Sequence, residues 1–500
     1  MKRAILFVAV TIPLSACGKG TPNGDGSTGG AGGGAIDVNS SGGMRDGGST
    51  PDAGGMCNVA IASCNLGSSL DAGSSLDGGS LTTVGPYAVG HVGYALADAT
   101  LYPRTVMAGV WYPVDPATLT SATPPASYPF DEWTNQLPVS ISKDWEPLGY
   151  ASAYEQPAPS RSGPFPLVMF SPGFKQNIWE YLYIGPRLAS YGFVVAIISH
   201  DGDGQYPWIP SVDVSVLFHR PRDAAFAITE LLQKSSSPDQ LLYGLVDASK
   251  IAMSGHSLGG YATLALAGGD DYICETQPAV DGGQPQQVCD PVPIDQRIKA
   301  IVPLDGSSWA LRWNEMARIA VPSLILGETF EHMISFMGGS PDDALGSARA
   351  HAAINRSDSH RVDLLMANHI SFSNRCDGFS VMANLGVDAS TLVNIFGSDF
   401  FTSSTRCGSD TGFDPTTNPA SHQLVTTYML AFLNTYLRRE DDSATLTSSY
   451  ARQYQPEVEF FDTEACNECP PGDGEFSYRP HPCRCSVGMK EVPSSGCPPQ

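Results

Sequence analysis

KIAMSGHSLGGYATLA occupies residues 250–265. It begins with an apolar run, 251–253, typical of the end of a buried strand, and it continues into a helix-like run from Tyr261. Between the two runs, GHSLG at 255–259 matches the pattern G-x-S-x-G. A serine at the tip of so sharp a turn has a strained backbone, so its neighbours must lack side-chain bulk. Strand, turn and helix together predict a nucleophile elbow with Ser257 at its tip.

Strand-like and helix-like segments alternate on both sides of this stretch. Apolar runs predict strands at 106–112, 165–170, 192–198, 297–304, 322–326 and 361–366, and other patterns predict helices at 177–190, 223–233 and 422–437. The run FPLVMF at 165–170 is apolar at nearly every position, as expected for a strand covered on both faces. We therefore predict an α/β protein of the α/β-hydrolase fold, with a mostly parallel twisted sheet and helices on both faces.

Composition limits the partners that the chain can bind. Its 500 residues are 42% hydrophobic, enough for a large core. The net charge of −23 leaves no basic surface for nucleic acid and disfavours docking on anionic lipid by charge. The same acidity also suits a soluble, self-repelling surface with no specific partner.

The first residues are typical of an export signal. A basic pair at 2–3 precedes an apolar run at 4–14, and LSAC at 14–17 resembles the lipobox of bacterial lipoproteins. The resemblance implies lipidation of Cys17, and Gly18 after it hints at the outer membrane. The alternative is an ordinary cleaved signal peptide and a secreted protein. No other run reaches the ~18 apolar residues of a membrane-spanning helix.

Shifts in composition divide the chain into four parts. Residues 1–16 are the predicted signal peptide, and the Gly/Ser-rich residues 17–80 are a flexible tether. Residues 81–440 form the predicted hydrolase domain, with a Gly/Pro/Gln-rich insertion at about 270–296. Residues 441–500 are a Cys-rich C-terminal tail.

Cysteine usage agrees with export. The chain has 12 cysteines, and lipidation of Cys17 would leave an odd number, so that one is unpaired or intermolecular. An oxidising compartment favours disulfides, and proximity in sequence suggests the pairs Cys57–Cys64, Cys274–Cys289 and Cys376–Cys407. Four tail cysteines could alternatively hold zinc (Cys466, Cys469, Cys483 and Cys485), but their spacing is irregular. We predict no metal site and no cofactor.

A serine hydroxyl becomes a nucleophile only with a base and an orienting acid behind it. In α/β-hydrolases both residues follow the serine in the chain. We select His369 as the base because it follows the last clear strand, on a loop expected over the carboxyl edge of the sheet. The candidate acids are Asp305, which ends the strand 297–304, and Glu331, which follows the next strand. We favour Asp305 and keep Glu331 as the alternative.

Two backbone N–H groups are candidates for stabilising an oxyanion. Leu258 follows the serine at the helix start. Phe174 ends the turn SPGF at 171–174, after the early strand, where the second donor is expected. Pro172 in that turn has no N–H and cannot serve. The alternative is a plain β-turn.

With these motifs in place, the chain resembles the platelet-activating-factor acetylhydrolase, dienelactone hydrolase and polyester hydrolase group of the α/β-hydrolase superfamily. The matching segments are VWYP at 110–113, LVMFSPGF at 167–174, LASYGFVVA at 188–196, GHSLGG at 255–260, VPLDG at 302–306 and ANHISFS at 367–373. The resemblance covers roughly residues 84–438. In the acetylhydrolases the acid follows the strand that Asp305 ends here. In the polyester hydrolases it follows the next strand, where this chain has Glu331.

The resemblance implies a serine carboxylester hydrolase acting through an acyl-enzyme, on a small-molecule, lipid or polyester substrate. The chain departs from the group at Pro172, where a histidine is common, and in its cysteine-bearing insertion and tail. Two alternatives remain: a non-catalytic, envelope-tethered binding protein on a hydrolase scaffold, and a peptidase or amidase with the same triad.

Overall fold

The computed structural model describes residues 80–98, 102–126, 152–174, 176, 178–200, 215–271, 273, 291–328, 346–365, 367–377, 418–447, 449–451 and 458–462. All of them belong to one compact unit, Gly67–Gln500. The predicted signal peptide and almost the whole tether lie outside the described residues, as do most of the insertion and tail. Within the described ranges, no helix combines the length and apolar character needed to cross a bilayer.

The described strands form one sheet of ten strands in the order β10-β9-β8-β7-β6-β4-β5-β2-β1-β3. Their bounds are β1 Ala88–Asp98, β2 Tyr102–Val114, β3 Ala153–Glu155, β4 Phe165–Ser171, β5 Val194–Ser199, β6 Val246–His256, β7 Ile298–Leu304, β8 Ser323–Glu328, β9 Ser359–Leu364 and β10 Val458–Asp462. The strands from β5 across β4 and β6 to β9 are parallel. The pairs β1–β2, β2–β5 and β9–β10 are antiparallel.

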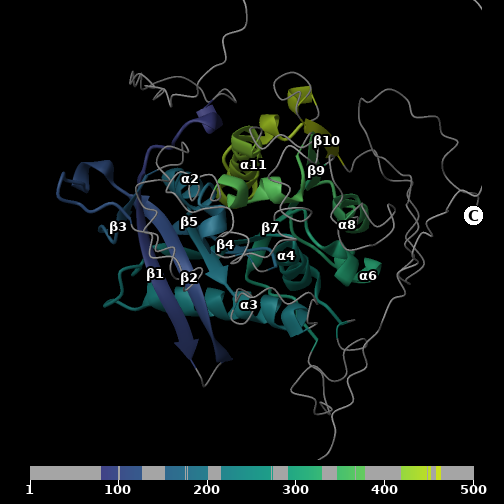
Figure 1. Ribbon diagram of the computed structural model, residues 1–500, viewed down its shortest axis with the longest axis horizontal. Coiled ribbons are helices and arrows are strands. Elements are labelled where there is room, and N and C mark those ends of the chain that lie inside the picture. The colour runs from purple at the N-terminus through teal and green to yellow at the C-terminus, as the bar shows by residue number, and fades with distance from the viewer. Residues whose placement is uncertain are drawn as a thin grey trace, which may run out of the picture. The chain divides into compact units, whose positions relative to one another are not determined.

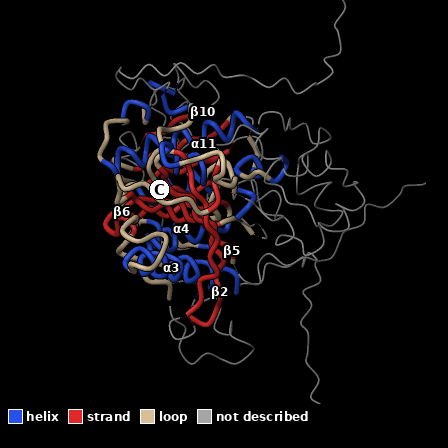
Figure 2. The backbone as a smooth tube through the Cα atoms, turned by 90° about the vertical axis from the view of Figure 1, so that its left-hand side faces the viewer, coloured by secondary structure: helices blue, strands red, loops and turns tan. Residues whose placement is uncertain are grey.

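Helices cover both faces of this sheet. Their bounds are α2 Gly185–Ser190, α3 Ser215–Ser236, α4 Leu258–Gly268, α6 Trp313–Met316, α8 Gly346–Ile354 and α11 Asn418–Leu433. Residues of α2 and α11 share one core cluster, and residues of α3, α4 and α8 share the other. Figures 1 and 2 both show α11 and α3 on opposite sides of the strands. The predicted α/β class, with a mostly parallel sheet between two helical layers, is confirmed.

Strand β4 shows why its sequence is apolar throughout. All seven of its residues are buried. Val168 and Phe170 belong to the cluster with α2 and α11, while Leu167 and Met169 belong to the cluster with α3 and α4. Side chains alternate between the two faces of a strand, so a strand covered on both sides needs apolar residues at every position.

Strand order makes the centre of the sheet a topological switch point. Strand β4 has β5 on one side and β6 on the other. The chain therefore leaves β4 in one direction through α2 and returns on the opposite side to build β6. Ligands of open parallel sheets bind outside the carboxyl ends of the strands at such a switch point. Ser257 immediately follows β6 at this edge.

Several predicted elements differ from the observed ones. The predicted helix at 177–190 is a 3-10 turn, Ile178–Tyr181, followed by the short helix α2. Pro186 lies in the first turn of α2, where its missing N–H is tolerated, and it cannot extend a helix from upstream. Helix α3 begins well before the predicted residue 223 and contains Pro221.

The C-terminal side of the sheet extends further than predicted. Strand β10 lies in the segment assigned to the Cys-rich tail, and it pairs antiparallel with β9 from Val458↔Leu364 to Asp462↔His360. Strand β10 of the sheet therefore lies beyond residue 440, the C-terminal bound predicted for the hydrolase domain. The predicted helix 422–437 is α11 followed by a π-helical turn, Asn434–Arg438.

Candidate active site

The G-x-S-x-G segment forms the predicted strand–turn–helix. Strand β6 ends at His256, α4 begins at Leu258, and Ser257 between them has φ 56° and ψ −119°. A non-glycine residue at positive φ is strained and persists only where the surroundings fix it. A Cβ on Gly259 would lie 1.8 Å from the Ser171 carbonyl oxygen. Glycine at that position lets the turn after β4 reach the start of α4.

Backbone hydrogen bonds tie Ser257 to the end of the neighbouring strand β7. The Ser257 N–H donates to the Leu304 oxygen at 3.0 Å, and the Ser257 oxygen accepts the Ser307 N–H at 3.0 Å. Asp305 lies between these two partners and has a positive φ of 40°. The serine turn and the aspartate turn therefore fix each other.

Asp305 and His369 form a direct pair. The His369 Nδ1 lies 2.5 Å from Asp305 Oδ2, and the two side chains are only 17% and 12% exposed. A carboxylate can only accept, so Nδ1 carries the proton, and Nε2 of the neutral ring is left as an acceptor. The bond is charge-assisted, which makes it roughly twice as strong as a neutral hydrogen bond.

His369 is held at the start of a capped 3-10 turn, His369–Phe372. The Asn368 side chain accepts the N–H groups of Ile370 and Ser371, both at 3.1 Å. The Ser371 hydroxyl in return accepts the Asn368 N–H at 3.1 Å. This reciprocal cap fixes the backbone from which the imidazole projects.

The other histidines after Ser257 have different environments where the structure describes them. His360 Nε2 is 2.9 Å from the Tyr436 hydroxyl, and His351 is buried on α8. His422 stacks on Tyr183 with ring centroids 4.0 Å apart. His332 and His481 lie outside the described residues, as does Glu331, the alternative acid.

Leu258 follows Ser257 directly, and the turn that leads to Phe174 packs against the helix start that follows Ser257. Leu258 is the first residue of α4, so its N–H belongs to the positive end of that helix. The turn containing Phe174 packs on the same helix start, since a Cβ on Gly259 would also lie 2.7 Å from the Pro172 oxygen. The sequence places these residues in two distant segments, and the sheet brings the segments together.

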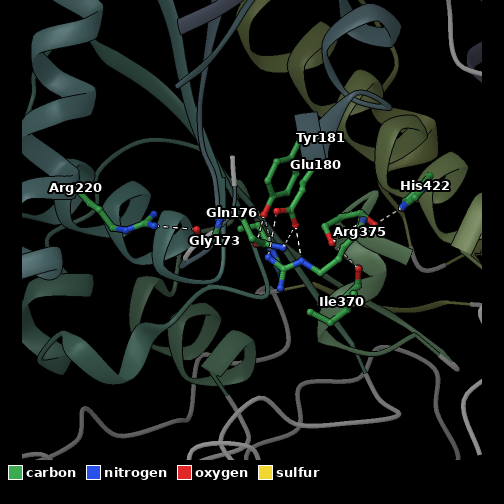
Figure 3. A network of polar contacts seen from close by, with 10 residues as sticks. Gly173, Gln176, Glu180, Tyr181, Arg220, Ile370, Arg375 and His422 are labelled. Carbon is green, nitrogen blue, oxygen red and sulfur yellow. Dashed lines mark hydrogen bonds and ion pairs between the residues drawn. The ribbon is translucent and has the colours of Figure 1, made fainter. Parts of the chain in front are cut away.

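A buried polar network beside the serine was not predicted (Figure 3). Tyr181 accepts the Gly173 N–H at 2.9 Å, and its hydroxyl bonds to Gln176 Oε1 and lies 2.8 Å from His256 Nδ1. Gln176 donates to Glu180, which pairs with Arg375 at 2.7 Å. Glu180 and Tyr181 lie in the segment 177–190 that was expected to be helical, where nothing marks an interior tyrosine as part of a site.

His256 lies against the candidate base. Its ring centroid is 4.5 Å from that of His369. Burial first, and then the positive charges that His369 and Arg375 can carry, hold the pKa of His256 well below its ordinary value. His256 is therefore neutral near pH 7 and adds no positive charge beside His369.

His200, at the end of β5, belongs to a second serine–histidine–aspartate arrangement. Its Nδ1 is 2.8 Å from Asp223 Oδ2 and its Nε2 is 2.8 Å from the Ser171 hydroxyl. Burial would raise the pKa of Asp223, but hydrogen bonds from His200 and Arg104 outweigh it and lower the pKa to about 2. Ser171 is fully buried, so this group holds β4, β5 and α3 together without reaching a substrate.

Two further predictions concern metals and disulfides. Among the described residues, no group of three or more His, Cys, Asp or Glu side chains is placed to hold a metal ion. Cys376 is disulfide-bonded, and the other cysteines of the chain all lie outside the described residues. Its partner, which we expect to be Cys407, therefore lies outside as well, and so do Cys17 and the pairs Cys57–Cys64 and Cys274–Cys289.

Comparisons with known proteins find similarity to ester hydrolases. Residues 142–280 match the PETase family model, described as PET hydrolase-like. Cutinase est2 of Thermobifida alba is 27% identical over 181 residues, which are 35% of this chain and 45% of the cutinase. A bis(hydroxyethyl) terephthalate hydrolase of Streptomyces coelicolor is 32% identical over 111 residues, 22% of this chain and 31% of that protein. The chain thus spans less than half the length of these curated relatives.

A solved structure of a ferulic acid esterase from Streptomyces cinnamoneus superposes with a TM-score of 0.46 at 20% identity. It covers 76% of this chain and 97% of that one.

Proposed function

We propose that this chain, an α/β-hydrolase related to the polyester hydrolases, is a serine carboxylester hydrolase that works through an acyl-enzyme. The observation that carries the proposal is the 2.5 Å bond between His369 Nδ1 and Asp305 Oδ2. It lies at the sheet edge where Ser257 occupies the tip of the elbow. An activated serine requires a base to take its proton and an acid that orients the base.

The arrangement supports a two-step reaction. His369 Nε2 takes the Ser257 hydroxyl proton as the serine oxygen attacks the ester carbonyl, and the proton then passes to the leaving alcohol. Asp305 keeps the imidazole oriented and stabilises its positive form. Water, deprotonated by the same nitrogen, then attacks the acyl-enzyme, and the proton returns from Nε2 to the Ser257 oxygen as the acid leaves.

The N–H groups of Leu258 and Phe174 are the proposed donors to the oxyanion in both steps. Each such donor, where it has been removed from other hydrolases, accounts for roughly 3–4 kcal/mol of transition-state stabilisation. A neutral His256 beside His369 also helps, because it adds no charge that would oppose formation of the imidazolium.

The relatives, whose names include a cutinase and a terephthalate ester hydrolase, support a class of substrate. We propose that the chain cleaves carboxylic esters and that polyesters are among its substrates. Hydrolysis of p-nitrophenyl butyrate, bis(hydroxyethyl) terephthalate and an aliphatic polyester film tests this range, with the matched p-nitroanilide as the amide control.

The direct test compares Ser257→Ala with wild type on p-nitrophenyl butyrate. We expect turnover to fall to background while the circular dichroism spectrum and Tm are unchanged. Ser249→Ala is the matched control, since Ser249 is an exposed serine of the same strand whose hydroxyl bonds only to Asp247. Turnover retained by Ser257→Ala would overturn the proposal.

We also propose that the protein is exported and attached to the cell envelope by a lipid on Cys17. The lipobox-like LSAC at 14–17 and the secretion expected of cutinase-like enzymes support this. Metabolic labelling with an alkyne-tagged fatty acid should modify the wild type and not Cys17→Ser. Labelling of both proteins, or of neither, would contradict the anchor.

A further inference from the structure

Arg220 of helix α3 reaches from the far side of the turn that follows β4. Its guanidinium donates to the Pro172 oxygen at 2.5 Å and to the Gly173 oxygen at 2.9 Å. The side chain is 1% exposed, and Figure 3 shows it directed at Gly173. A buried guanidinium that holds two successive carbonyls leaves the turn little freedom to rotate.

These two carbonyls set the directions of two peptide planes. In a trans peptide the C=O of one residue and the N–H of the next are antiparallel and coplanar. Holding the Pro172 oxygen therefore fixes the Gly173 N–H, which donates to the Tyr181 hydroxyl at 2.9 Å. Holding the Gly173 oxygen fixes the direction of the Phe174 N–H, the proposed oxyanion donor.

The contacts around the turn act from opposite sides. The Gly173 oxygen also accepts the Gln176 N–H at 3.1 Å. On the side of the serine, a Cβ on Gly173 would lie 3.2 Å from His256 Nδ1, so the turn is packed directly against the residue before Ser257. The turn is thus bound by Arg220 on one side and packed against the elbow on the other.

The positive charge of Arg220 also affects the strength of the Phe174 N–H as a donor. A cation donating to a peptide oxygen polarises that peptide group, and its N–H becomes a stronger donor. The effect is largest where water is excluded, as it is around Arg220. Arg220 therefore both aims and strengthens the N–H of Phe174.

We propose that Arg220 is a positioning residue for ester hydrolysis, which holds the turn 172–174 so that the Phe174 N–H meets the oxyanion. It acts through the backbone and does not touch the substrate. The inference rests on the proposed function at Ser257 and extends it to a residue of α3 that no sequence motif indicates.

The test compares Arg220→Gln and Arg220→Lys with the matched control Arg222→Gln. Lysine keeps the charge but cannot present a fork to two carbonyls. Arg222 is two residues along the same helix and donates instead to the Phe218 oxygen. Each protein is titrated for active sites with a fluorophosphonate, and kcat, KM and Tm are then measured on p-nitrophenyl butyrate.

We expect kcat per titrated site to fall about 10- to 100-fold in Arg220→Gln, because misplacing a catalytic group by about 1 Å costs on that order. The fall in Arg220→Lys should be about tenfold, and KM should stay within about threefold of wild type. The Ki of a trifluoromethyl ketone, which forms the same oxyanion, should rise by the factor by which kcat/KM falls. Arg222→Gln should match wild type.

A purely structural role gives a different pattern. The inference would be overturned if both Arg220 variants had a lower Tm and fewer titratable sites but kept the turnover per site and the ketone affinity of the wild type. Arg220→Lys decides the matter if Arg220→Gln does not fold. A wild type that neither cleaves esters nor reacts with the fluorophosphonate would overturn the proposed function itself, and this inference with it.

Discussion

Replacing Asp305 by asparagine tests the acid of the proposed triad. The change keeps the side-chain volume and removes the charge that accepts the His369 Nδ1–H at 2.5 Å. A hydrogen bond to a charged group contributes about 1.5–3 kcal/mol, so loss of the charge alone should lower kcat about 10- to 100-fold.

The asparagine amide adds a second penalty. If its NH₂ faces His369, it donates to Nδ1 and fixes the proton on Nε2, the nitrogen that must accept the serine proton. With the wrong tautomer the expected loss reaches about 10⁴-fold, or about 5.5 kcal/mol. We therefore expect Asp305→Asn to lose between 10²- and 10⁴-fold in kcat with little change in KM.

The assay is hydrolysis of p-nitrophenyl butyrate at pH 8, with circular dichroism and Tm to confirm folding. Glu331→Gln is the control, since Glu331 is the alternative acid. It should keep nearly full activity. If Glu331→Gln lost activity while Asp305→Asn stayed within tenfold of wild type, the acid would be Glu331, and the assignment of Asp305 would be wrong.

Three further predictions concern stability and fold. Burial raises the pKa of Asp270 from 3.8 to about 6. The stability gained from keeping this carboxyl protonated in the folded state is therefore present below about pH 4 and is lost as the pH rises through 6. Between pH 4 and 7 the free energy of unfolding of the wild type, measured in urea, should fall by about 2 kcal/mol relative to that of Asp270→Asn, and parallel pH profiles would contradict this. In Gly260→Ala, the new Cβ would lie 2.4 Å from the Gly306 Cα, so we expect about 1–3 kcal/mol of destabilisation and reduced kcat. Gly93→Ala, with open space at its Cβ, should be nearly neutral, and equal effects of the two changes would refute the steric argument. Glu180→Gln leaves a buried guanidinium uncompensated and should cost about 3–5 kcal/mol in urea unfolding; a loss below about 1 kcal/mol would contradict that.

The sequence predicts the central strands well because they are buried on both faces. Segments such as FPLVMF at 165–170 must be apolar throughout, and that signal does not depend on distant residues. The elbow was predictable for a similar reason, since Ser257 at positive φ needs its flanking glycines within a few positions. Both signals are local.

Edge strands were harder to predict. Strand β10 forms by pairing with β9, almost 100 positions earlier, and it lies close to a Cys- and Pro-rich stretch. Its strand character comes from that pairing rather than from its own pattern, because β propensity depends on context. The predicted start of α3 was too late. A proline such as Pro221 usually marks a helix boundary, but in this structure it lies inside the helix.

In the candidate site, too, some residues could be predicted from the sequence and others could not. His369 and Asp305 each follow a predicted strand, so parallel strand order was enough to bring them to one edge. Arg220 and Tyr181 contribute through contacts with backbone atoms of the turn at 172–174, and a contact to backbone leaves no residue-type signature in the partner segment. Such supporting residues are therefore defined by the folded structure and not by a sequence motif.

Covalent labelling measures whether Ser257 is an activated nucleophile without assuming a substrate. The purified protein is treated with a fluorophosphonate at pH 8, and intact mass and peptide mapping follow. We predict one adduct per chain, located on Ser257, and labelling slowed at least about 100-fold in His369→Ala. An unlabelled wild type, or an adduct on another serine, would contradict the account.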